Sequence, residues 1–357
     1  MVDLERAALV ARLHGNEVAL ERLEVVLAEP SLDAEARGQV RLSGNYPLGL
    51  DLDWQLELPP SARLSGSGRI GGDLERLAVD HRIDGSVRVR VDAHLEDPLE
   101  APSWDGEIRL AGIDLPDFAP DAPAIDLNAR LATRGDLDQA TLTGTLSGKA
   151  PDLPDFGDLR SALEVRWEDR VLTIDALDLD ESVSGARLRV KGGLDLRPQV
   201  PTFDLRGSWE QLRWPLTGDL IAESAKGNVA AAGTLEDYDY SLDADADGPD
   251  LPALALTLRG AGDHQGTQIE SLELRTLDGV VTASGTAAWA PEPAWDLKLV
   301  GEGLNPKELA PDLDDRIGLR LDTKGGLKGY GYDLAVTTKG PGLPPARLAL
   351  GGTGDLE

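Results

Sequence analysis

The chain of 357 residues contains no cysteine, so a disulfide framework is excluded. Aromatic residues amount to only 4%, with three Phe, and Met occurs once. The apolar residues, which make up 41% of the chain, are therefore mostly Leu, Val and Ala. No run of 18 apolar residues occurs, so the sequence offers no membrane-spanning helix. The first residues also lack the basic and apolar regions of a signal peptide.

Basic residues are scarce relative to acidic ones, with 35 Lys and Arg against 64 Asp and Glu. The formal charge of −29 repels nucleic-acid phosphate and anionic lipid surfaces, so we expect no nucleic-acid partner. The same charge favours solubility, which a protein with much apolar surface needs.

Residues arranged for catalysis or metal binding are also lacking. Residues 243–248 resemble the start of a calcium loop, but the twelfth position of that loop is Leu254 instead of a glutamate. Residues 66–71 fit the glycine spacing of a dinucleotide loop, yet strand-like sequence surrounds them, so we interpret them as turn glycines. We predict no catalytic residue, no metal, no cofactor and no enzyme. The histidines lack metal spacing and are expected at exposed strand or turn positions: His14, His81, His94 and His264.

Strict alternation of apolar and polar residues is the dominant pattern that the sequence does contain. It is clear in residues 48–58, 87–95, 163–167 and 254–258. A period of two predicts β-strands with one apolar face and one solvated face. Antiparallel sheets accommodate such strands, whereas all-parallel sheets generally bury both faces. The 40 Gly and 23 Pro cluster between these runs and indicate turns.

The first 27 residues are the stretch that most resembles a helix. Residues 2–27 are rich in Ala, Leu, Arg and Glu, which favour helices. Residues 20–25, however, match residues 174–179 and 269–274, and both copies lie in strand-like sequence. We therefore predict strands for this stretch as well.

The chain repeats itself at a fixed spacing. Three matches keep one offset, and they pair residues 233–242 with 325–334, 248–252 with 340–344, and 256–263 with 348–355. A constant period predicts stacked units that share one architecture. Because the chain opens in patterned sequence and closes on what looks like a cloning remnant, we interpret it as a segment of a longer protein. We predict one continuous β domain over 1–357, built from repeats of roughly 1–134, 135–232, 233–324 and a partial 325–357.

The apolar faces of these strands allow two interpretations. In a sandwich, two sheets bury their faces against each other. Alternatively, the faces line a groove that stays open and holds acyl chains, for which walls rich in Leu and poor in aromatics are suitable. Each buried CH₂ contributes about 0.8 kcal/mol, so part of one acyl chain is enough for binding. Alternation alone favours the sandwich core and leaves the groove as the alternative.

Three stretches resemble a known family. Residues 207–218 read Gly-Ser-Trp-Glu-Gln-Leu-Arg-Trp-Pro-Leu-Thr-Gly. Residues 71–77 read Gly-Gly-Asp-Leu-Glu-Arg-Leu, and residues 97–106 combine Asp-Pro-Leu with Ala-Pro-Ser-Trp-Asp-Gly. In these motifs, and in general sequence character over nearly its whole length, the chain resembles the TamB (translocation and assembly module) family of the AsmA-like group in Gram-negative bacteria. It is most similar to a central periplasmic segment of such a protein.

The resemblance implies a fold and a function. TamB-like proteins are anchored in the inner membrane, cross the periplasm and fold as an elongated, all-β, mostly antiparallel sheet bent into a U, a β-taco with an apolar groove. The resemblance implies a conduit that shields phospholipid acyl chains between the inner and outer membranes, like bridge-like lipid transfer proteins. It also implies the outer-membrane barrel TamA as a partner. The alternatives are a scaffold for outer-membrane protein assembly with a TamA-like barrel and a purely structural β stalk.

With the resemblance, the groove becomes the favoured interpretation of the apolar faces. The individual residues follow from alternation and not from any family motif. The predicted lipid-groove positions are Leu50, Leu52, Trp54, Val87, Val89, Val91, Val165, Ile174, Leu177, Leu205, Leu256, Leu258, Leu272, Leu274, Leu297 and Leu299.

Overall fold

In a computed structural model, the chain folds almost entirely into β-strands. It forms two compact units, Met1–Val183 and Ser184–Glu357, and each is described by itself. The repeat-based division of the chain stays a prediction. The structure describes residues 4–28, 30–113, 115–118, 126–149, 157–215, 218–340 and 344–355.

The first unit contains twelve strands and one short helix, α1 (Leu115–Phe118). Its strands are β1 (Leu4–His14), β2 (Glu17–Leu27), β3 (Ser31–Arg41), β4 (Leu48–Leu58), β5 (Ala62–Gly72), β6 (Arg76–Gly85), β7 (Val87–Glu96), β8 (Ser103–Ile113), β9 (Asp126–Asp136), β10 (Gln139–Lys149), β11 (Leu159–Glu168) and β12 (Val171–Glu181).

The second unit contains eleven strands and a short 3-10 turn, η1 (Pro306–Glu308). Its strands are β13 (Arg187–Asp195), β14 (Thr202–Trp214), β15 (Ala222–Gly233), β16 (Tyr238–Gly248), β17 (Leu251–Gly262), β18 (Gly266–Thr276), β19 (Gly279–Ala288), β20 (Ala294–Leu304), β21 (Arg316–Gly326), β22 (Gly329–Lys339) and β23 (Ala346–Gly354).

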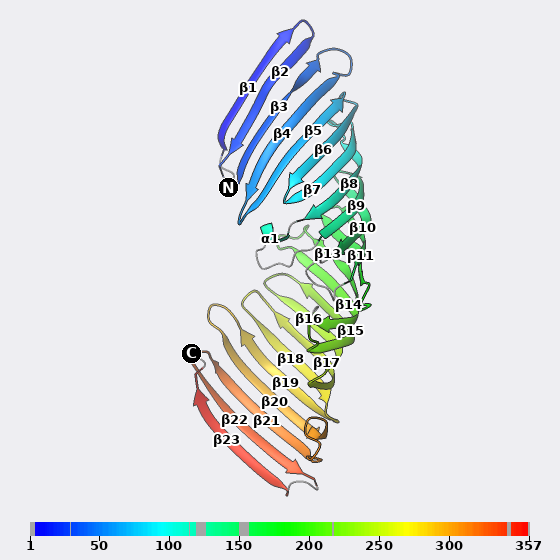
Figure 1. Cartoon of the computed structure of the whole chain (residues 1–357). Helices are drawn as coiled ribbons and strands as arrows, with labels where there is room; N and C mark the ends of the chain where they lie inside the picture. Colours follow the sequence, from blue (N-terminus) through cyan, green and yellow to red (C-terminus); the bar gives the residue numbers. More distant parts are fainter. Residues whose placement is uncertain are drawn as a thin grey trace. The chain divides into compact units, whose positions relative to one another are not determined.

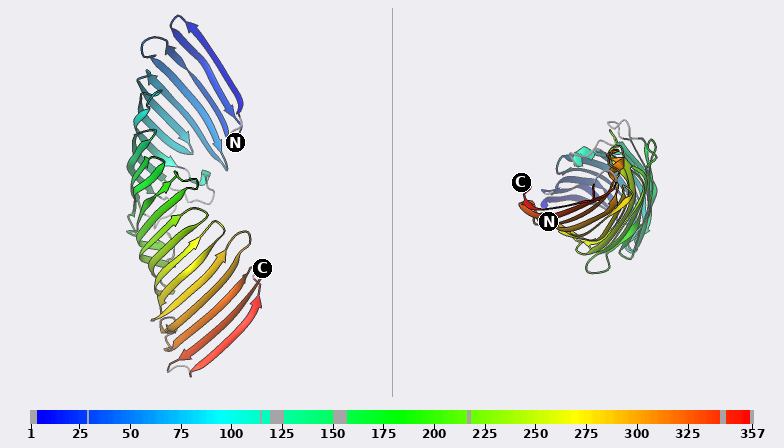
Figure 2. Two further views of the ribbon diagram at one scale, coloured as in Figure 1. Left: turned by 180° about the vertical axis from the view of Figure 1, so that it is seen from behind. Right: turned by 90° about the horizontal axis from the view of Figure 1, so that it is seen from below.

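Within each unit, every strand pairs antiparallel with the strand that follows it in sequence (Figure 1). In the described part of the first unit β1 pairs only with β2, so this sheet does not close on itself. Both sheets curl (Figure 2). The prediction of an all-β, antiparallel fold is confirmed. The strand prediction for residues 2–27 is also confirmed, because β1 and β2 occupy this stretch.

Within the described residues, neither unit contains a second sheet layer that could cover the apolar faces. Among the described residues, the buried hydrophobic ones are Ala62 and Ala129 alone. The accessible surface is 22071 Å², whereas a compact protein of this size exposes about 14,000 Å². The sandwich interpretation is therefore wrong within each unit, since it requires a dry core between two layers.

Glycines inside the strands accommodate aromatic rings of the neighbouring strands. A Cβ at Gly66 would lie 2.1 Å from Cε2 of Trp54, and a Cβ at Gly227 would lie 2.1 Å from Cζ2 of Trp209. Gly66, Gly68 and Gly71 all lie inside β5, so their interpretation as turn glycines is wrong. Alternation could not show this, because the need for glycine comes from the ring on the neighbouring strand.

Candidate functional site

The strand register gathers the apolar side chains of the first unit on one face. Residues opposite each other in an antiparallel pair share a face. One continuous row therefore runs from β4 to β12, with apolar or glycine residues on every strand except β6, which contributes a histidine: Leu52, Gly68, His81, Val91, Ile108, Leu131, Gly144, Leu163 and Leu177. The apolar face of unit 1 is this row with the parallel rows at even spacings to either side.

The second unit has an equivalent face. Its central row runs from β13 to β23 and contains only apolar residues and glycine: Val190, Gly207, Val229, Leu242, Leu258, Leu272, Ala283, Leu299, Leu321, Leu334 and Leu350. We call this row, with its neighbours two residues away, the apolar face of unit 2.

Register places all the predicted groove residues on these two faces. Leu50, Leu52, Trp54, Val87, Val89, Val91, Val165, Ile174 and Leu177 lie on the apolar face of unit 1, and all are half-buried. Leu205, Leu256, Leu258, Leu272, Leu274, Leu297 and Leu299 lie on the apolar face of unit 2. Leu205 is the most exposed of the set, at 40%. Contact of these residues with lipid stays a prediction.

The apolar face is the more enclosed face of the first sheet. Small side chains allow a fair comparison, because their own size hardly shields them. On the apolar face Ala129 is 8% exposed and Ser161 is 6% exposed. Ala132 and Ala162, which lie on the opposite face of the same two strands, are both exposed. Side chains around the apolar rows therefore converge more closely than those on the charged face.

Sequence reasoning placed Trp54 on these faces but missed three other indole rings and the hydrogen bonds that hold them. Trp104 Nε1 donates a hydrogen bond of 3.1 Å to Thr133 Oγ1. Trp209 Nε1 donates one of 2.8 Å to Ser224 Oγ, and Trp295 Nε1 donates one of 3.0 Å to Thr323 Oγ1. A buried donor without a partner is costly, so each bond removes a polar spot from the hydrocarbon-like surface. A Trp on one strand with Thr-x-Gly on the next was the available signal, at 133–135 and 323–325.

The prediction for His81 is wrong. His81 lies half-buried on the apolar face of unit 1, where its Nε2 accepts a hydrogen bond of 2.9 Å from Trp54 Nε1. The two rings stack, with centroids 5.9 Å apart. Trp54 is on β4 and His81 is on β6, and the intervening Gly68 leaves room beneath them. The other three histidines are exposed, as expected: His14, His94 and His264.

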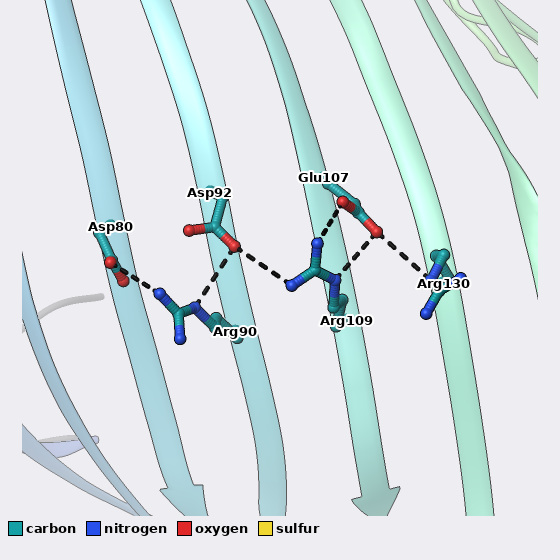
Figure 3. A network of polar contacts seen from close by, with 6 residues as sticks. All are labelled: Asp80, Arg90, Asp92, Glu107, Arg109 and Arg130. Carbon is teal, nitrogen blue, oxygen red and sulfur yellow. Dashed lines mark hydrogen bonds and ion pairs between the residues drawn. The ribbon is translucent and has the colours of Figure 1, made fainter.

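The opposite, charged face carries ion pairs both within single strands and between neighbouring strands. In the ladder of Figure 3, Arg90 binds Asp80 at 2.9 Å and Asp92 at 3.3 Å. Arg109 binds Glu107 at 2.5 Å, and Glu107 also reaches Arg130 at 3.4 Å (Figure 3). The hydrogen bond from Arg109 holds the pKa of Glu107 below its ordinary value, and the same bond raises the pKa of Arg109. Exposed pairs of this kind contribute little stability each.

A shallow hollow of about 1000 Å³ opens on this charged face, over β5 to β8. Its lining includes Arg69, Asp80, Arg90 and Asp92, whose side chains pair with each other or with Asp51. A hollow lined by ions is unsuited to hydrocarbon, so it does not belong to the apolar site.

Turn carboxylates make the stability of the protein sensitive to acid. Backbone N–H groups of Gln139 and Asp138 donate to Asp136 and lower its pKa, and those of Gln265 and Gly266 do the same for Asp263. A lowered folded-state pKa stabilises the protein above the unfolded pKa, and this contribution is lost as the pH falls through the folded value.

We therefore expect the free energy of unfolding to fall between about pH 5 and about pH 2. Urea titrations at a series of pH values measure it. Asp136→Asn keeps an acceptor oxygen but does not titrate, so it should show a flatter pH dependence than the unchanged chain. An identical slope would show that Asp136 is not involved.

The described residues contain no group of three or more His, Asp or Glu side chains placed to hold a metal ion. None of the helices within the described ranges is both long and apolar enough to cross a membrane.

These features define a class of protein: a repetitive, all-β protein whose unclosed sheets keep one face apolar and one face charged. A family model described as "TamB, N-terminal domain" matches residues 1–101 and 172–329, which together exceed half of the chain. The chain therefore belongs to the TamB family, as the sequence motifs predicted. No solved structure matches it. TamB proteins are components of transport and assembly that work with TamA, and the family is not known for enzymatic activity. The place of this segment within a longer chain stays a prediction.

Proposed function

We propose that this chain is part of a conduit that shields phospholipid acyl chains on its apolar faces during transfer between the inner and outer membranes. The observation that carries the proposal is the pair of uncovered apolar rows, which run through β4 to β12 and through β13 to β23. The full-length protein would be anchored in the inner membrane, cross the periplasm and meet a TamA-like barrel.

The energetics support this assignment. Half-buried Leu and Val side chains on an open sheet leave apolar surface in water, and hydrocarbon that covers it gains about 0.8 kcal/mol per CH₂. The row of unit 2 offers this surface on consecutive strands through Leu242, Leu258 and Leu272, with no charged side chain between them. An acyl chain that leaves one strand therefore meets an equivalent surface on the next strand, so movement of the lipid requires no chemical step.

Native mass spectrometry of the segment purified from bacterial cells tests the proposal. Co-purified phospholipid, with saturable uptake of a fluorescent fatty acid, is the expected result. Absence of both would overturn the proposal and favour the purely structural stalk.

A scaffold for outer-membrane proteins is the second candidate, because within the described residues β1 is hydrogen-bonded to β2 alone. Leu9 and Leu13 on β1 are 67% and 65% exposed, and a strand that is paired on one side can accept a further strand by β-augmentation. Photo-crosslinkers at Leu9 and at Leu258 discriminate between the two functions. Adducts to barrel precursors at Leu9, without lipid adducts at Leu258, would support the scaffold.

A further inference from the structure

One corner of the apolar face of unit 1 is covered from outside the sheet. Ala62, the first residue of β5, is 0% exposed. It lies opposite Leu58, so it belongs to the apolar face. Neighbouring strands shield only the sides of an alanine in a one-layer sheet, so full burial requires cover from above. Among the described elements that lie outside the sheet, the short helix α1 contacts β5.

Two hydroxyl groups hold α1 in this place through Asp117. Ser86 Oγ donates to Asp117 Oδ2 at 2.5 Å, and Ser61 Oγ donates to the backbone carbonyl of Asp117 at 3.1 Å. Ser86 in turn accepts a hydrogen bond from Arg63 N at 3.0 Å and is itself buried. The helix follows β8 in sequence, yet it is fixed at the ends of β5 and β6.

We propose that α1 is a strap that covers the β5 corner of the apolar face of unit 1 and competes with acyl chains for it. This inference rests on the proposed function, since it assumes that the face takes hydrocarbon. Pro116 and Phe118 of α1 are half-buried and supply apolar surface on either side of the anchoring Asp117. Among the described residues, two side-chain hydrogen bonds and a contact with β5 hold the strap.

The competition has a simple consequence. When only the strap-open state accepts a ligand at β5, the apparent affinity there is reduced by the fraction of open molecules. Fixing the strap closed therefore removes binding at β5, and loosening the anchor increases it. Binding on the apolar face of unit 2 is unaffected in both cases.

The absence of native cysteine allows a reversible lock. In the double variant Ser86→Cys with Asp117→Cys, oxidation can join only these two residues, and a thiol count confirms closure. Should the disulfide not close, a short bismaleimide joins the same pair.

The probe is a diazirine-bearing palmitic acid, and mass spectrometry maps its adducts to β5 and to β17. We expect β5 adducts to fall at least about fivefold on locking and, for the disulfide, to return on reduction, while β17 adducts stay constant.

Two further variants test the anchor without a crosslink. Asp117→Ala should raise β5 adducts and speed hydrogen exchange at 115–118. Asp138→Ala, in a turn at the opposite end of the sheet, should change neither. Equal β5 labelling in the locked and reduced protein would overturn the strap, as would labelling of β17 without any labelling of β5. Absence of labelling on both strands would overturn the proposed function itself.

Discussion

Replacing Leu258 by aspartate is expected to interrupt the apolar face of unit 2 and to stop acyl chains from passing that point. Leu258 lies opposite Leu242 on β16 and Leu272 on β18, so its side chain stands in the middle of the row. Displacing about three methylene groups from this spot costs about 2.4 kcal/mol, which corresponds to a loss of local occupancy of roughly fiftyfold. An unpaired carboxylate in hydrocarbon adds a further penalty.

The measurement is the yield of lipid adducts at a photo-crosslinking amino acid in place of Leu272. It should fall by at least about tenfold in the Leu258→Asp variant. A probe at Leu52, in the other unit, should keep its yield. Arg259→Asp is the matched control, because it adds the same carboxylate one residue away on the exposed, charged face. An unchanged yield at Leu272, in a variant with an unaltered circular dichroism spectrum, would rule out Leu258 as part of the path.

Gly285→Ala is expected to separate β19 from β20. Gly285 has φ +141°, which side chains rarely adopt, and a Cβ there would lie 2.0 Å from the carbonyl oxygen of Asp296. That oxygen belongs to the paired backbone of β20, where Gly285 lies opposite Leu297. Relief of the clash therefore requires the strands to move apart. We expect a loss of about 3 kcal/mol in the free energy of unfolding, from strain and from broken ladder bonds.

Urea denaturation measures this loss, and hydrogen exchange locates it at the amides of β19 and β20. Gly331→Ala on β22 is the control in the same unit, because the nearest atom to its Cβ would be Gly352 O at 3.9 Å. Its stability should change by less than about 1 kcal/mol. Similar behaviour of the two variants would mean that Gly285 is not required by the geometry of its strand.

Side-chain periodicity was sufficient to predict the strands, their faces and their antiparallel pairing. The alternation at Leu50, Leu52 and Trp54 specifies one side of β4, because successive side chains of a strand point to opposite faces. The same rule assigned Leu297 and Leu299 to the matching face of β20. Internal copies corrected the helical propensity of residues 2–27, since a repeated segment keeps its structure across copies.

Neighbours across strands could not be predicted in the same way. Trp54 reaches His81 across Gly68, and this contact joins residues on β4 and β6 through the register of three strands. A histidine in a strand therefore looked like an exposed residue. The contact between α1 and β5 could not be predicted for the same reason. Asp117 follows β8 in sequence and Ser86 follows β6, so the two meet only once the strands between them have paired.

The amino-acid sequence by itself determined which side chains share a face, because the period of a strand is a local property of the backbone. Only the tertiary structure decided that, among the described residues, no second layer covers that face and that α1 lies at one of its corners. The physical reason is that alternation is identical in a sandwich and in an open sheet. What lies above an apolar face depends on how distant parts of the chain come together.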